Sequence, residues 1–212
     1  YSYRRDNKAN VAFFPVYPLL ACGVSRLTGL RAEIALLLVS HISLIGAFVM
    51  ASVYLKERFA DNPNARGCAL LTMGVLPSTL YFRMTYTESL FILFVILLLY
   101  GMQREWPNWT LAIVVGAATG TRPVGVVLIV PLFVHIVLTS KSRWQLIREA
   151  VMVIPASAWG IGGFMCYQWW AFNEPFAFAK VQAFWATPGV GPENLIEKLV
   201  GLGSFEPLRM VY

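Results

Sequence analysis

A series of long apolar runs, separated by short polar segments, constrains the fold of this chain more than any other feature. An α-helix of about 20 apolar residues crosses the hydrocarbon core of a bilayer. Within lipid, a helix satisfies its own backbone hydrogen bonds, whereas irregular backbone cannot. We therefore predict an all-α, polytopic transmembrane helical bundle with six spans between residues 33 and 170. The expected spans are residues 34–55, 65–82, 90–102, 111–120, 124–138 and 150–170.

The composition of the 212-residue chain agrees with a membrane protein. The chain is 58% hydrophobic and 13% charged, whereas soluble domains carry about 25% charged residues. The net charge of +6 favours basic loops that set membrane topology over a nucleic-acid partner. The apolar runs carry no carboxylate in their middles, which argues against a proton or ion pathway.

The loops between the spans alternate between two sides of the expected bundle. Six Lys and Arg residues lie in loops 56–64, 103–109 and 139–148, whereas turns 83–87 and 121–123 hold two. Because basic loops are retained in the cytoplasm, we expect the first set there and the second set outside. The N-terminal loop also falls on the outer side, although its three Lys and Arg residues oppose this bias. The basic residues of the first set are Lys56, Arg58, Arg104, Lys141, Arg143 and Arg148.

The two ends of the chain are predicted to lie outside the spans. Residues 1–32 are expected to form an outer loop and an interfacial helix, because two prolines and Arg26 interrupt the short apolar stretch there. Residues 171–212 are expected to form another outer loop. The chain begins with Tyr1 and shows no signal peptide, so we interpret residues 1–212 as one transmembrane domain and an internal fragment of a longer protein.

Arg122 lies in the turn between two expected spans and has two possible roles. Its guanidinium could pair with a phosphate group, or it could reach from a helix end to the membrane interface. Thr121 could cap the following helix, and Pro123 suits the first position of that helix. Neither of these neighbouring roles requires an arginine, so Arg122 is a candidate substrate-binding residue.

Glu88 and three further polar residues are also candidates for substrate binding. Thr85 and Glu88 have the spacing of a capping box, with Thr85 as N-cap and Glu88 at the third helical position. Glu88 and Tyr86 could equally line an outer polar cavity that binds sugar hydroxyls, and the two roles are compatible. Lys180 and Gln182 follow an aromatic segment that suits a sugar or lipid headgroup or an aromatic belt at the interface.

Three expectations concern helix packing. His41 stands alone among apolar residues and predicts a hydrogen bond between helices. Gly116 and Gly120, like the glycines within residues 160–163, have the spacing typical of closely packed helices. The three cysteines lie in apolar context without a CxxC pattern or a nearby histidine, so we expect small buried packing residues rather than metal ligands.

Four segments, taken in order, carry a resemblance to a known family. They are AFFPVYPL at residues 12–19, TYTESLF at 85–91, GTRPVG at 120–125, and AFNEP at 171–175 followed by Lys180 and Gln182. Over nearly the whole chain, this pattern resembles the PIG-V-type mannosyltransferases, particularly their prokaryotic relatives, within the class C glycosyltransferase superfamily. The resemblance implies a polytopic enzyme that transfers a sugar from a polyprenyl-phosphate carrier, such as dolichyl-phosphate mannose, on the outer or luminal face.

The resemblance also implies how such an enzyme works. The lipid phosphate gains negative charge as it leaves, and Arg122 would stabilise that charge. A carboxylate would act as general base toward the acceptor hydroxyl. The acidic catalytic residue of the family is expected in a Trp-Asp segment of the first outer loop, upstream of residue 1, so the catalytic residue is not assigned here. Lys180 and Gln182 would hold phosphate or sugar.

The expected partners follow from this chemistry. They are membrane lipid, the polyprenyl-phosphate sugar as co-substrate, and a glycan or glycolipid acceptor; neither a metal site nor a tightly bound cofactor is expected. Eukaryotic members of the family act in GPI-anchor assembly, so the expected location is the endoplasmic reticulum in a eukaryote or the plasma membrane in a prokaryote. The alternatives are a transporter or flippase for lipid-linked sugars and a non-catalytic membrane scaffold subunit.

Overall fold

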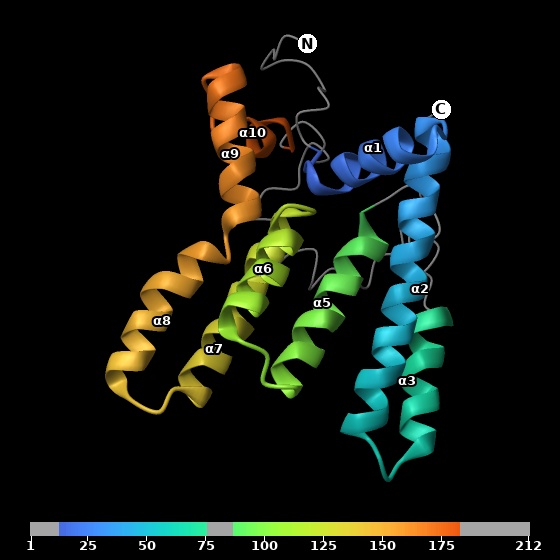
Figure 1. Ribbon diagram of the computed structural model, residues 1–212, viewed down its shortest axis with the longest axis vertical. Coiled ribbons are helices and arrows are strands. Elements are labelled where there is room, and N and C mark those ends of the chain that lie inside the picture. The colour runs from blue at the N-terminus through green and yellow to red at the C-terminus, as the bar shows by residue number, and fades with distance from the viewer. Residues whose placement is uncertain (1–12, 76–86, 183–212) are drawn as a thin grey trace, which may run out of the picture. The chain divides into compact units, whose positions relative to one another are not determined.

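The computed structural model describes residues 13–75 and 87–182, except for the side chains of residues 181 and 182. The all-α prediction is confirmed over these residues, because every regular element among them is helical (Figure 1). The elements are α1 (Val16–Thr28), α2 (Ala32–Arg58), α3 (Pro63–Val75), α5 (Glu88–Gln103), α6 (Asn108–Thr119), the 3-10 helix η2 (Pro123–Leu128), α7 (Ile129–Thr139), α8 (Arg143–Ala156), α9 (Trp159–Phe172) and α10 (Ala177–Gln182).

The chain divides into two compact units. The larger unit comprises residues 13–175 and contains all the described helices except α10. The described part of the other unit is residues 176–182, where α10 forms a short helix with Lys180 in its last turn.

Helix α2 is the longest described element and confirms the apolar run predicted at residues 34–55. It has 27 residues, a length of about 40 Å at 1.5 Å per residue. Glu33 lies in its first turn, and Lys56 and Arg58 lie in its last turn, which suits the positive and negative ends of the helix dipole. Among the described helices, α2 is long and apolar enough to cross a membrane by itself.

The span predicted at residues 150–170 is not one continuous helix, because two helices meet there. Helices α8 and α9 are bent by 46° across a short break, and only together do they have the length and hydropathy of a span. Pro155 lies inside α8 one residue before its end, where it removes a backbone donor and crowds the preceding turn. The Ser157 hydroxyl then donates to the Ile154 carbonyl at 2.6 Å within the break.

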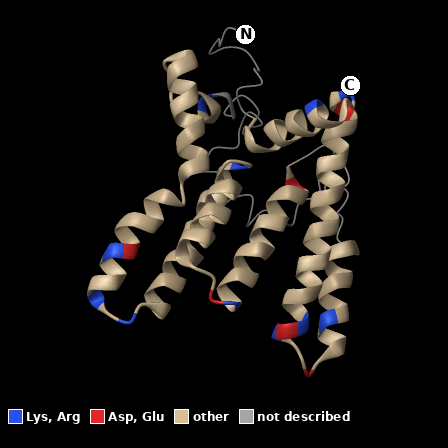
Figure 2. Cartoon of the chain, viewed as in Figure 1, with Lys and Arg blue, Asp and Glu red and all other residues tan. Residues whose placement is uncertain are grey.

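The remaining expected spans correspond to shorter apolar helices. Helices α5 and α6 have 16 and 12 residues, or about 24 and 18 Å of helix. The predicted span at 124–138 begins as the 3-10 helix η2 before continuing as α7. The predicted span at 65–82 is helical through α3, and residues 76–82 lie outside the described part. Figure 2 shows charged residues mostly near helix ends and uncharged residues along the middles.

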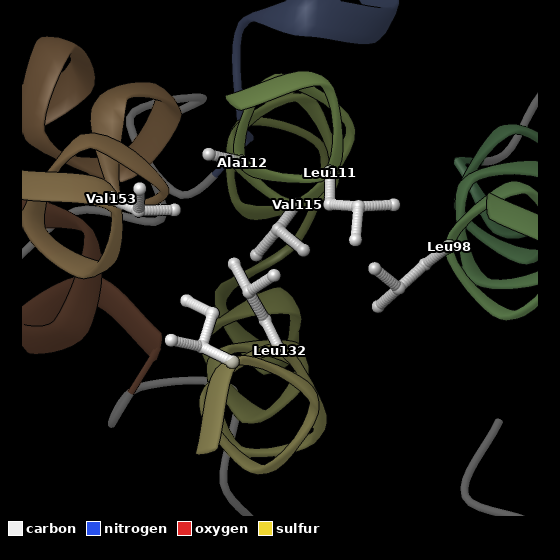
Figure 3. Close-up of a cluster of buried hydrophobic side chains, with 7 residues drawn as sticks. Leu98, Leu111, Ala112, Val115, Leu132 and Val153 are labelled. Carbon is white, nitrogen blue, oxygen red and sulfur yellow. The ribbon is translucent and has the colours of Figure 1, made fainter. Parts of the chain in front are cut away.

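Helix α6 lies at the centre of the main hydrophobic core. It packs against α5, α7, α8 and α9, and its inward side chains meet those of the neighbouring helices in Figure 3. A second cluster joins α1 to α2 and α5 through Tyr17, Val39 and Leu90. The buried members of the main cluster are Leu98, Leu111, Ala112, Val115, Leu132, Ile136 and Val153.

Glycines bring α6 and α9 into backbone contact, as predicted for Gly116 and Gly120. A Cβ atom added to Gly160 would lie 2.1 Å from the Gly116 carbonyl oxygen and 2.5 Å from the Gly120 nitrogen. No larger side chain fits without separating the two helices. At Gly162 and Gly163, no described residue lies within 4 Å of an added Cβ, so the prediction of close packing fails for these two glycines within the described structure.

Two packing predictions are wrong for a shared reason. All three cysteines, Cys22, Cys68 and Cys166, are exposed rather than buried. The Nδ1–H of His41 donates to the Leu37 carbonyl at 2.8 Å within its own helix, and His41 makes no hydrogen bond to another of the described helices. A helix that is apolar on every side does not indicate from its sequence which face points inward.

Candidate functional site

The structure brings together two of the predicted binding residues at one end of the larger unit. Arg122 Nη1 lies 2.7 Å from Glu88 Oε1, so the two side chains form an ion pair. Glu88 begins α5, and Arg122 immediately precedes η2. The start of α5 and the turn before η2, which were expected on the same side of the bundle, therefore meet at this pair. We call this pair, with Tyr17 and Ser40 beside it, the Arg122 site.

A tight turn after α6 positions Arg122. The backbone N–H groups of Thr121 and Arg122 both donate to the Ala118 carbonyl, at 3.1 and 3.2 Å. Arg122 is extended, with φ −151° and ψ 145°, as the following Pro123 requires. The Thr121 hydroxyl donates back to Ala118 at 2.7 Å. The prediction of Thr121 as the cap is therefore wrong, because Arg122 occupies that position and its side chain is left to pair with Glu88.

Glu88 lies at the start of α5 but not where a capping box would put it. Glu88 is the first residue of α5, and Thr87, at the N-cap, makes no side-chain capping bond. The capping-box prediction is therefore wrong in its position, and Thr85 lies outside the described residues. A carboxylate at this position still gains from the positive end of the helix dipole.

The Arg122 site has unused hydrogen-bonding capacity. The Arg122 and Glu88 side chains are 37% and 22% exposed, so water reaches the pair only in part. Glu88 Oε2 and the Ser89 hydroxyl are buried and have no hydrogen-bond partner among the described residues. A buried acceptor without a partner is costly, so a ligand hydroxyl that donates to Glu88 Oε2 would be bound favourably.

Tyr17 and Ser40 form a buried polar pair beside Glu88 that the sequence did not single out for function. The Tyr17 hydroxyl donates to the Leu36 carbonyl at 2.9 Å and lies 2.7 Å from Ser40 Oγ. Because a phenol has one proton, Ser40 is then the donor in the second bond. Burial raises the pKa of Tyr17, the Ser40 bond lowers it, and the Glu88 charge raises it.

Helix α1 is attached to the same turn that carries Arg122. The Val16 N–H donates to the Gly120 carbonyl at 3.1 Å, and Gly120 also lies at the contact between α6 and α9. The AFFPVYPL segment contains Val16 and Tyr17, so the resemblance pointed to this segment although only an interfacial role was predicted for it.

The other predicted binding residues are not part of this geometry. Tyr86 lies outside the described residues, and so does the side chain of Gln182. Lys180 lies on α10, which belongs to the other compact unit. The prediction that Tyr86, Lys180 and Gln182 contact the substrate remains a prediction.

Comparisons with known proteins do not add a family. No protein-family model, no curated protein and no solved structure matches the chain. Within residues 13–75 and 87–182, no group of three or more His, Cys, Asp or Glu side chains is arranged to hold a metal ion. At the Arg122 site, one carboxylate oxygen of Glu88 holds the guanidinium, and the second oxygen has no hydrogen-bond partner among the described residues.

Proposed function

We propose that the protein is a membrane glycosyltransferase that moves a hexose, with mannose the expected sugar, from a polyprenyl-phosphate carrier to a glycan or glycolipid acceptor. The observation that supports this function is the ion pair between Arg122 and Glu88 at the junction of apolar helices. Charged residues between apolar helices are costly and commonly mark the path or site of a substrate.

The transfer step needs both kinds of group found at the Arg122 site. The acceptor oxygen forms a new bond to the sugar C1 while the bond from C1 to the phosphate oxygen breaks, and its electron pair leaves with the phosphate. Arg122 has five N–H donors and, among the described residues, pairs only with Glu88. Its other donors would stabilise the leaving phosphate, and Glu88 Oε2 would accept a sugar hydroxyl.

The acceptor proton requires a separate base in this proposal. One oxygen of Glu88 is held by Arg122, so in this proposal Glu88 orients the sugar. The family resemblance implies a carboxylate in the first outer loop as the base. Lys180 and Gln182 would hold phosphate or sugar, and Tyr86 would contact the sugar.

The proposal includes six spans and an extracytoplasmic Arg122 site. Gln103 and Arg104 contact Glu57, so the end of α2 and the end of α5 lie together. Glu88 at the start of α5 and Arg122 before η2 meet at the opposite end of α5. This pattern agrees with chain reversal at each expected span. The Lys and Arg bias then puts the Arg122 site outside the cytoplasm. The six spans would be α2, the span at residues 65–82 that begins as α3, α5, α6, η2–α7 and the bent α8–α9 pair.

A transfer assay with matched variants tests the function. The full-length protein in liposomes would receive radiolabelled dolichyl-phosphate mannose and a membrane extract as the acceptor source. We expect Arg122→Ala to lower turnover at least about a hundredfold, the cost of removing one positioned donor to a developing anion. Arg104→Ala, which breaks the ion pair with Glu57, should retain turnover. Wild-type turnover in correctly inserted Arg122→Ala would remove Arg122 from the mechanism.

A lipid-linked sugar transporter is the second candidate, because one observation favours it. The α8–α9 pair is bent by 46° at its break, and discontinuous helices commonly form the binding sites of transporters. A transporter would move fluorescent polyprenyl-phosphate sugar between the leaflets of a vesicle without breaking its glycosidic bond. A transferase would release polyprenyl phosphate in the same vesicles.

A further inference from the structure

A second polar region lies in the larger unit, and the proposed transfer reaction does not use it. A cavity of about 830 Å³ opens between the start of α6, the end of α7 and one face of α8. We call it the α8 cavity. The lining residues that matter here are Asn108, Trp109, Leu138, Lys141, Arg148 and Glu149.

The α8 cavity holds two cations that have no carboxylate partner in the described part of the chain. Neither Lys141 nor Arg148 forms an ion pair with any residue in the described part of the chain. Glu149 lines the same cavity, but its two oxygens accept hydrogen bonds from the neutral amides of Asn108 and Gln145. Because those amides satisfy Glu149, the two basic side chains remain available for an anionic ligand.

The local backbone adds partial positive charge beside Lys141 and Arg148. Pro107 precedes α6 and provides no side-chain cap for its first N–H groups. Helix α8 also begins beside Lys141, with Ser142 as its N-cap. The starts of two helices contribute partial positive charge near the same cavity, in addition to the two cations.

Two carboxylates limit the charge of the ligand. Glu149 and Glu105 both line the α8 cavity, and each would repel a second negative charge. A phosphodiester carries a single charge and still offers oxygens to Lys141 and Arg148, whereas a phosphate monoester approaches two. The described charges therefore favour a phosphodiester over a phosphate monoester.

Apolar side chains line the cavity beside the cations. Trp109, Leu138 and Met152 are 51%, 78% and 52% exposed, and all three line the α8 cavity. Tryptophan is enriched at the membrane interface, where headgroups lie. A ligand with a phosphodiester and an acyl portion would use the cations and these apolar side chains together.

We propose that the α8 cavity binds the phosphodiester headgroup of a membrane phospholipid, with Lys141 and Arg148 as the phosphate ligands. This binding site is distinct from the Arg122 site and does not depend on sugar transfer. It would be occupied whether the protein is a transferase or a transporter.

Native mass spectrometry of the delipidated full-length protein in detergent tests the proposal. The probes are short-chain phosphatidylglycerol, its deacylated headgroup glycerophosphoglycerol, and the matching diacylglycerol. We expect phosphatidylglycerol to bind most tightly and diacylglycerol, which lacks phosphate, to bind at least about tenfold more weakly, the loss for one charge-assisted hydrogen bond. Tight binding of the deacylated headgroup alone would support the phosphate site with a soluble source. Equal binding of diacylglycerol would overturn the proposal.

Variants separate the cavity from general surface charge. Lys141→Ala with Arg148→Ala should weaken phosphatidylglycerol binding at least about tenfold. Arg143→Ala is the matched control, because Arg143 is exposed on the same helix and does not line the cavity. Equal losses in the double variant and in Arg143→Ala would overturn the site.

A further variant should change affinity in the opposite direction. Glu149→Gln removes a negative charge from the α8 cavity and keeps a side chain that can bond to the amides of Asn108 and Gln145. We expect it to tighten phosphatidylglycerol binding severalfold. Weaker binding in a folded Glu149→Gln protein would contradict the assignment of a phosphate to this cavity.

Discussion

The Arg122 site and the α8 cavity hold their arginines in different ways. Arg122 is paired with Glu88 at 2.7 Å and is partly buried, whereas Arg148 is exposed beside an open cavity without an ion-pair partner in the described structure. A paired guanidinium is fixed in direction and suits a charge that develops at one place during a reaction. An unpaired one suits a stable anion that stays bound.

The two regions also differ in how the backbone supports them. The Arg122 turn is held by α6, α9 and α1 through Gly120 and its neighbours. Lys141 lies in a polar connection between α7 and α8, and its described backbone contact is a hydrogen bond to Gln145 Oε1 at 3.3 Å. We therefore expect the Arg122 side chain to keep a fixed position and the Lys141 side chain to adjust to its ligand.

The largest expected effect would break the support of the Arg122 site. Gly160→Ala puts a methyl group against the α6 backbone, and such overpacking costs about 1–3 kcal/mol. Gly162→Ala is the matched control on the same helix, since its methyl group meets open space and should stabilise α9 by ~0.5 kcal/mol. Denaturant unfolding of both proteins measures the difference. Equal stability would show that the glycine contact does not hold the two helices.

Double-mutant cycles would sharpen the difference between a partly buried and a more exposed arginine ion pair. Glu88→Gln and Arg122→Gln should show a coupling of about 1 kcal/mol, because the pair is partly buried but still reached by water. The cycle for Arg104 and Glu57 should show no measurable coupling, since Arg104 is half exposed. A larger coupling in the second pair would reverse the comparison.

Tyr17→Phe tests whether the polar pair beside Glu88 contributes to stability. Loss of the bonds to Leu36 and Ser40 should cost about 1 kcal/mol. The pKa of Tyr17 is raised above the ordinary value of 10.0 in the folded protein. The contribution of the neutral phenol is therefore complete below pH 10 and is lost as the pH rises toward the folded-state pKa. Unfolding curves at alkaline pH should show this loss in the wild type and not in Tyr17→Phe.

The smallest expected effect concerns the start of α8. Ser142 accepts a hydrogen bond from the Gln145 N–H at 3.1 Å, and Ser142→Ala should cost about 0.5 kcal/mol, the lower range for an N-cap. Ser142→Asp should retain the stability. Because Lys141 precedes this cap, Ser142→Ala should slightly weaken phosphatidylglycerol binding and leave sugar transfer unchanged. Reduced transfer would show that the two regions are coupled.

Some of this structure could be predicted from the sequence, for identifiable reasons. The run at residues 34–55 is long and uninterrupted, so it predicts α2 well. The alternation of polar connections predicted that Arg122 and Glu88 would lie at the same end, and they form an ion pair. The spacing of Gly116 and Gly120 predicted a close contact with a neighbouring helix.

Other features depend on tertiary contacts that composition does not contain. Helix α9 has almost no polar face, so the sequence did not indicate that Cys166 points outward. The bend between α8 and α9 lies beside Pro155, and the contact of Gly160 with α6 comes just after it. The α8 cavity is formed by three separated segments, and neither Lys141 nor Arg148 has a sequence motif.

The contact between Gly160 and the α6 backbone gives α9 a mechanical role. No side chain lies between the two backbones at this point to absorb a displacement. The Ile161 N–H also donates to Thr119 Oγ1 at 3.2 Å, immediately before the turn that carries Arg122. If α9 rotates about its break with α8, the end of α6 and the Arg122 guanidinium would shift with it. A change in the bend between α8 and α9 would therefore change the geometry of the Arg122–Glu88 ion pair.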